Sequence, residues 1–77
     1  MDGKAEALEF VVRNSSDILG VPLKQLHIKR DILIAGIIRN GKKAVIPSGD
    51  DCIVEGDRVI VLAANHRLRD LSDIIQR

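Results

Sequence analysis

Residues 32–46 read ILIAGIIRNGKKAVI, and this stretch predicts the hairpin around which the fold is built. Ile32–Arg39 is rich in residues that favour strands, and Asn40-Gly41 follows it directly. Asn-Gly is the strongest short signal for a β-hairpin because both central residues of the turn need a positive φ. The stretch therefore predicts a strand over Ile32–Arg39, a tight turn, and a return strand over Lys42–Ile46.

The residues before this hairpin predict one more strand and a short helix. Leu8, Phe10 and Val12 alternate with other residues at a period of two, which is typical of a strand. Pro22 suits the first position of a helix because its missing N–H costs nothing there. We expect a short helical turn over Pro22–Leu26, with Leu23 and Leu26 facing inward.

The residues after the hairpin predict a loop, two strands and a helix. Residues 47–51 form a loop by composition, and residues 55–57 form a second tight turn. Short strands are predicted over Cys52–Val54 and Arg58–Ala64. Asn65 is a good N-cap, and the apolar residues after it share one helical stripe. They are Leu68, Leu71, Ile74 and Ile75.

These elements predict an α+β fold. It consists of a small, mainly antiparallel β-sheet with one short helix and one long C-terminal helix. We find no internal repeat and no low-complexity segment, so the 77 residues are expected to form a single domain.

Two of the predicted strands are apolar on both faces. Ile32, Ile34 and Ile38 alternate with Leu33, Ala35 and Ile37, and residues 59–64 show the same pattern. Such strands must be covered on both faces, yet the chain offers one long helix and one short one. We expect a homodimer formed through this sheet or its edge. The alternative is that the short helix and the N-terminal segment suffice as cover.

Composition and charge exclude several classes of partner. Twelve Lys and Arg stand against eleven Asp and Glu, and Phe10 is the sole aromatic residue, so the sequence offers neither a basic surface nor a stacking platform for nucleic acid. The longest uncharged apolar run, Ile32–Ile38, is far shorter than a membrane span, so no direct membrane insertion is expected. Cys52 is the only cysteine, which fits a reducing cytoplasm.

No constellation in the sequence predicts an enzyme or a metal site. Residues 36–42 match G-x-x-x-x-G-K, but Lys43 replaces the Ser or Thr of a P-loop and the context is a hairpin. His27 and His66 have no further ligand at metal-binding spacing on the same predicted element. Cys52 has no visible Cys-His-Asn order and is expected in the core. Asp50, Asp51, Glu55 and Asp57 lack the calcium-loop pattern and resemble turn formers.

Arg39 is the best single candidate for binding an anion. It ends an apolar strand beside the Asn40-Gly41 turn, and a guanidinium next to an apolar surface recognises phosphate well. We therefore take Ile37, Ile38, Arg39 and Asn40 as candidate ligand-binding residues. The alternative is a solvated arginine at a strand end.

Five segments of the chain resemble, in order, the TrkA C-terminal domain, also called the C-terminal half of the regulator of potassium conductance (RCK) domain. They are AEALEFVV (5–12), LGVPLKQL (19–26), IAGIIRNG (34–41), IPSGD (46–50) and EGDRVIV (55–61). The resemblance implies a regulatory, ligand-sensing and dimerisation domain over residues 1–77, cut from a longer chain. The whole protein would be a peripheral cytoplasmic subunit at the inner face of the cell membrane, controlling a membrane potassium transporter or channel.

The resemblance also bears on ligands. In that family the preceding domain is a Rossmann unit that binds NAD or ATP, and this sequence has no G-x-G-x-x-G, so neither cofactor is expected in this domain. Related domains can bind cyclic di-AMP at their dimer interface. Two alternatives stay open: an assembly domain without a ligand of its own, and the same module attached to another ion or dicarboxylate transporter.

Overall fold

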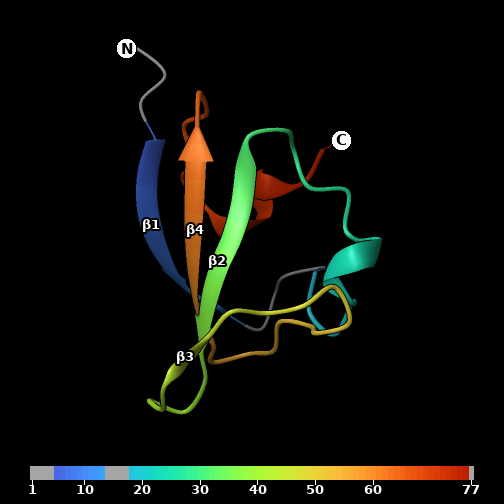
Figure 1. Ribbon diagram of the computed structural model, residues 1–77, viewed down its shortest axis with the longest axis vertical. Helices are drawn as coiled ribbons and strands as arrows, with labels where there is room; N and C mark the ends of the chain where they lie inside the picture. The colour runs from blue at the N-terminus through green and yellow to red at the C-terminus, as the bar shows by residue number, and fades with distance from the viewer. Residues whose placement is uncertain (1–4, 14–17, 77) are drawn as a thin grey trace.

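Residues 5–13 and 18–76 are described by the structure, a computed structural model. Four strands form one antiparallel sheet in the order β1-β4-β2-β3 (Figure 1). The strands are β1 (Ala5–Val11), β2 (Ile32–Ile38), β3 (Ala44–Val45) and β4 (Arg58–Ala64), and two 3-10 helices are η1 (Leu23–Gln25) and η2 (Leu71–Ile74). The predicted small antiparallel sheet is confirmed.

The hairpin between β2 and β3 forms where the sequence predicts it. Asn40 and Gly41 have φ values of 56° and 68°, and the Lys42 amide donates to the Arg39 carbonyl at 3.1 Å. β3 is shorter than predicted, because only Ala44–Val45 pairs with β2. The chain leaves the sheet after Val45 and runs into the loop over residues 46–51.

A β-bulge in β2 overturns the predicted alternation of its side chains. The register against β4 shifts between Ile34 and Gly36, so Ala35 is an extra residue. An extra residue in a strand exchanges the faces of all residues beyond it. Ile34 and Ile37 are therefore both buried, and Ile38 lies on the same face as Leu33.

The core lies on one face of the sheet. Val59 and Val61 of β4 are fully buried against Ile53 and Ile74, which come from the segments that cover this face. The C-terminal segment passes behind β4 and β2 in the view of Figure 1. Leu23 and Leu26, at η1, pack against the core as predicted.

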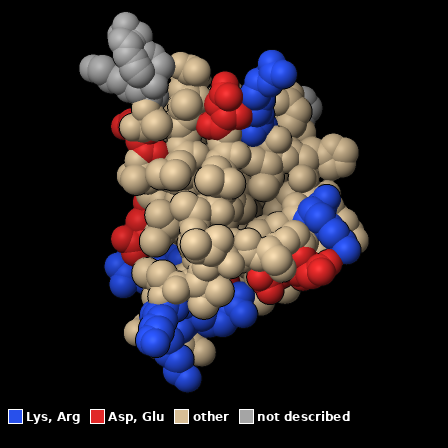
Figure 2. Space-filling view, viewed as in Figure 1, with Lys and Arg blue, Asp and Glu red and all other residues tan. Residues whose placement is uncertain are grey.

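The opposite face of the sheet, here called the outer face, is uncovered in the described chain. Pairing registers place eight apolar residues of β1, β2 and β4 on it. They are Ala5, Ala7, Val11, Leu33, Ile38, Ile60, Leu62 and Ala64. Val11, Leu33 and Leu62 keep 49%, 59% and 39% of their surface exposed. The middle of this face is almost free of charged side chains (Figure 2).

The predicted long C-terminal helix is wrong. Asn65 has a φ of 63°, in the left-handed region, whereas an N-cap has extended backbone. The only helical turn that follows in the described residues is η2, with Asp70 and Asp73 forming its capping box. Leu71 and Ile74 are buried nevertheless, so the apolar stripe correctly identified inward-facing residues.

Hydrogen bonds to a distant segment explain why the C-terminal residues are extended. The Lys29 amide donates to the Ile74 carbonyl at 2.8 Å, and the Gln76 amide donates to the His27 carbonyl at 2.6 Å. Ile28 and Ile75 form an antiparallel bridge between these two bonds. The backbone groups that a helix would use internally are therefore paired with residues 27–29. No helix in the described parts of the chain is long and apolar enough to cross a membrane.

The predicted strand over Cys52–Val54 is reduced to two single bridges. Cys52 pairs with Pro22 and Ile53 pairs with Leu19. The turn after it is as predicted, since the Asp57 amide donates to the Val54 carbonyl at 3.1 Å and Gly56 has a φ of 91°. The loop and turn bring residues 47–57 beside the hairpin, where they form the site.

Candidate anion-binding pocket

A pocket of about 500 Å³ lies between the β2–β3 hairpin and the loop that follows it. The hairpin and the loop each supply one wall. The lining residues are Ile37, Arg39, Asn40, Lys42, Lys43, Val45, Pro47, Asp50, Asp51 and Cys52. The pocket thus combines apolar side chains with cationic and polar ones, which is the usual composition of small-molecule sites.

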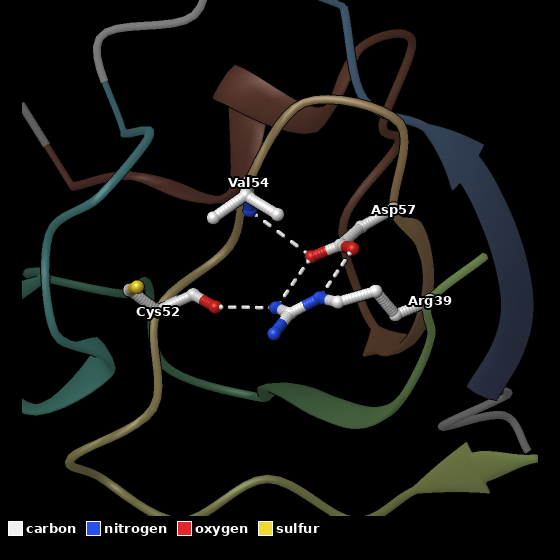
Figure 3. Close-up of polar contacts among 4 residues, drawn as sticks. All are labelled: Arg39, Cys52, Val54 and Asp57. Carbon is white, nitrogen blue, oxygen red and sulfur yellow. Dashed lines mark hydrogen bonds and ion pairs between the residues drawn. The ribbon is translucent and has the colours of Figure 1, made fainter.

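Arg39 is held in this pocket by a bidentate ion pair with Asp57. Its Nε donates to Oδ1 at 2.8 Å and its Nη2 donates to Oδ2 at 2.9 Å (Figure 3). Nη2 also donates to the Cys52 carbonyl at 3.0 Å, and the Val54 amide donates to Asp57 Oδ2 at 3.0 Å. Asp57 is fully buried, whereas about half of the Arg39 side chain is exposed. Arg39 therefore connects the end of β2 to the turn before β4.

The ion pair fixes the charge state of both groups. Hydrogen bonding from Arg39 lowers the pKa of Asp57 and outweighs burial, which acts in the opposite direction, while the Val54 amide lowers it further. The same hydrogen bond raises the pKa of Arg39. A buried carboxylate without its counter-ion is strongly unfavourable, so Arg39 stabilises the fold in addition to any role in binding.

One nitrogen of Arg39 is left for a ligand. Nη1 points away from Asp57 and makes no hydrogen bond to any described residue (Figure 3). The guanidinium can therefore donate to an anion in the pocket without giving up Asp57. An arginine side chain that one carboxylate already holds in place loses little conformational entropy when it binds a second anion.

The remaining charges of the pocket leave it with a cationic rim. Asp50 is paired with Lys24 at 2.7 Å, and Asp51 accepts hydrogen bonds from the Ser48 amide at 2.7 Å and the Ser48 hydroxyl at 3.3 Å. Lys42 and Lys43 are exposed and form no ion pair with the described residues. Lys and Arg side chains gather at the hairpin end of the molecule (Figure 2). This arrangement favours an anion.

Three of the four predicted site residues line the pocket. Ile37, Arg39 and Asn40 do, whereas Ile38 lies on the outer face because of the bulge at Ala35. The sequence predicts Asp57 only as a turn former and does not identify Lys42 or Lys43 as ligand contacts. The position of Lys42 and Lys43 directly after Asn40-Gly41 was a usable signal, because a tight turn places the residues that follow it beside Arg39. Asp57 gave no such signal because it lies 18 residues from Arg39.

The other residues considered from the sequence form no second site. His66 Nε2 lies 2.8 Å from the Arg30 carbonyl, so this ring has a structural hydrogen bond. Cys52 is a partly buried free thiol at the pocket wall. Across residues 5–13 and 18–76, no group of three or more His, Cys, Asp or Glu side chains could hold a metal ion.

Comparison with known proteins assigns the chain to a family. The family model described as the TrkA-C domain matches residues 7–76. The chain belongs to the TrkA-C family. Its relatives include Trk system potassium uptake protein TrkA homologues from Pyrococcus abyssi and Pyrococcus horikoshii, at 34% and 30% identity over 73 residues. The match covers 95% of this chain and 32% of each relative. This TrkA-C domain thus spans about a third of the length of these potassium uptake proteins.

A solved structure supports the same assignment. It is described as an RCK domain with cda, and it matches this TrkA-C domain with a TM-score of 0.65 and 30% sequence identity. The match covers 77% of this chain and 81% of that one. The expected TrkA-C and RCK membership is confirmed by both kinds of comparison.

Proposed function

We propose that this chain is the ligand-sensing and dimerisation domain of a peripheral, cytoplasmic subunit of a potassium uptake system. It would act by conformational control of a membrane transporter or channel and would carry out no covalent chemistry. TrkA-C membership supports the link to potassium uptake. The single observation that carries ligand sensing is the pocket, with its cationic rim and apolar wall.

The chemistry of the pocket favours an anion with an apolar, planar part. Lys42, Lys43 and Nη1 of Arg39 supply positive charge, and Ile37 and Val45 supply apolar surface. A cyclic dinucleotide has both features, and the neighbour solved as an RCK domain with cda supports cyclic di-AMP as the first ligand to test. NAD or ATP would be bound by a different, Rossmann-type domain of the whole protein.

Signal transfer would pass through Asp57. Its side chain holds Arg39, while its carbonyl accepts a hydrogen bond from the Val12 amide at 2.8 Å. The Gly56 amide donates to the Val12 carbonyl at 3.0 Å, so the turn is bonded to the end of β1 on both sides. An anion that pulls on Arg39 would shift this turn and β1 together. A ligand that binds one of two such arrangements better shifts their populations.

Calorimetric titration of cyclic di-AMP into the purified protein tests this proposal. We expect saturable binding that weakens at least about fivefold in the double variant Lys42→Ala, Lys43→Ala. Arg67→Ala is the matched control, because Arg67 is exposed and does not line the pocket. Arg39→Ala is a poor test on its own because it strands the buried Asp57 carboxylate. No heat up to ~1 mM ligand would reject the proposal.

A second candidate function is assembly without a ligand. Two observations favour it. The three hydrogen bonds described for the Arg39 side chain go to Asp57 and Cys52 of the same chain, and the outer face is uncovered. In that case, the protein would self-associate without any response to cyclic di-AMP. The same titration, combined with a measurement of mass in solution, separates the two functions.

A further inference from the structure

The loop wall of the pocket, residues 47–52, is bonded to η1 through its backbone. The Lys24 amide donates to the Gly49 carbonyl at 2.9 Å, and the Leu23 amide donates to the Asp51 carbonyl at 2.8 Å. The two segments are in close contact here, because a Cβ added at Gly49 would lie 3.1 Å from the Lys24 Cβ. The position between the two bonded carbonyls is therefore fixed relative to η1.

Asp50 occupies this position and forms an ion pair with Lys24. Its Oδ1 lies 2.7 Å from the Lys24 Nζ. Asp50 lines the pocket, whereas Lys24 lies outside the lining. The side chains of Lys24 and Asp50 are 60% and 79% exposed, so the pair contributes little to folding stability. Its effect is instead on the charge that the loop wall presents to the pocket.

The charge balance of the pocket depends on this pair. The Arg39 guanidinium is already neutralised by its own carboxylate partner. The two lysines of the rim are therefore opposed by Asp50 and Asp51, the carboxylates that line the pocket. With Asp50 paired, Asp51 is the one lining carboxylate without a cationic partner among the described residues. Without Lys24, two carboxylates would oppose two lysines, and the excess of positive charge would be lost.

We propose that Lys24 is a positioning residue of the anion pocket. It holds the Asp50 carboxylate against η1 and so keeps the loop wall from repelling an anion. The inference rests on the proposed anion binding and identifies a residue outside the pocket that controls it. An untied carboxylate would approach the anion, and a unit charge ~8 Å away changes a dissociation constant by about threefold near a protein surface.

Calorimetric titration of cyclic di-AMP into charge variants tests the effect on binding. We expect Lys24→Gln to weaken binding about threefold, while Lys24→Arg, which keeps the charge, binds as the wild type does. In the Asp50→Asn background, Lys24→Gln should weaken binding less than about 1.5-fold, because no carboxylate is left to hold. Lys29→Gln is the matched control, since it removes the same charge from a residue outside the pocket and outside the ion pair.

A second measurement needs no ligand. Relaxation of amide protons by a cationic and an anionic nitroxide probe, compared at low salt, reports the local electrostatic potential. At the amides of Lys42 and Lys43, the preference for the anionic probe should fall in Lys24→Gln and stay unchanged in Lys29→Gln.

The two measurements separate this inference from the proposed function. An unchanged probe preference in Lys24→Gln would overturn the role of Lys24, even if cyclic di-AMP binds. Binding weakened equally by Lys24→Gln and Lys29→Gln, or by neither, would also overturn it. If the wild type does not bind cyclic di-AMP, the proposed function fails, and the probe measurement still decides whether Lys24 sets the charge of the pocket.

Discussion

The ion pair between Arg39 and Asp57 should be one of the strongest single contributions to stability. Breaking a buried pair by removing one partner costs about 3–5 kcal/mol. Because half of the Arg39 side chain is exposed and water can reach the vacated site, we reduce this to about 2–3 kcal/mol for Arg39→Ala. A chain of this length has a total stability of about 4–12 kcal/mol, so the loss is a large share.

Urea denaturation followed by circular dichroism measures this cost. Arg58→Ala is the matched control because Arg58 also pairs with a carboxylate, that of Glu9, but both of those side chains are well exposed. Its expected cost is about 0.5 kcal/mol. A double-mutant cycle with Asp57→Asn then isolates the coupling between Arg39 and Asp57. The reasoning is refuted if Arg39→Ala costs no more than Arg58→Ala.

The pKa of Asp57 is lowered below its ordinary value of 3.8, so its contribution to stability is present above that value and is lost as the pH falls through the folded-state pKa. At pH values below about 4, the urea concentration at the unfolding midpoint should therefore decrease more in the wild type than in Asp57→Asn. Gly56→Ala should lower the free energy of unfolding by about 1–2 kcal/mol, because Gly56 has a φ of 91°. Gly36→Ala should lower it by less than about 0.5 kcal/mol, because the added Cβ meets only ordinary contacts. Equal losses of stability in thermal unfolding would contradict this difference. Ile74→Ala should lower the free energy of unfolding by about 2–5 kcal/mol, because Ile74 is fully buried. It should also reduce the hydrogen-exchange protection of the Lys29 amide, which donates to the Ile74 carbonyl. Unchanged protection would argue against the pairing of the C-terminal segment with residues 27–29.

Local signals in the sequence predicted the elements that depend on local geometry. Asn40-Gly41 identified the hairpin because the turn requires positive φ at both residues, and β4 matches its predicted bounds. The bulge at Ala35 could not be predicted, because a run of apolar residues without polar ones does not indicate which residues face the core. As a consequence, Ile37 and Ile38 were both predicted on the wrong face of the sheet.

Long-range contacts account for the other errors. The spacing of Leu71, Ile74 and Ile75 suits a helix, but backbone bonds to residues 27–29 decide the conformation, and no local pattern reveals a partner that distant. The candidate site was partly predictable for the same reason. Arg39 and Asn40 were found from the turn beside them, whereas the role of Asp57 required the tertiary structure.

The pocket between the hairpin and the following loop is proposed to bind an anionic ligand. Amide chemical shifts recorded during a titration with cyclic di-AMP show which residues the ligand reaches. We predict the largest changes at Asn40, Lys42, Lys43 and Cys52, with smaller ones at Asp57 and Val12 along the proposed route to β1. Changes confined to residues away from this pocket, or no changes at saturating ligand, would contradict the claim.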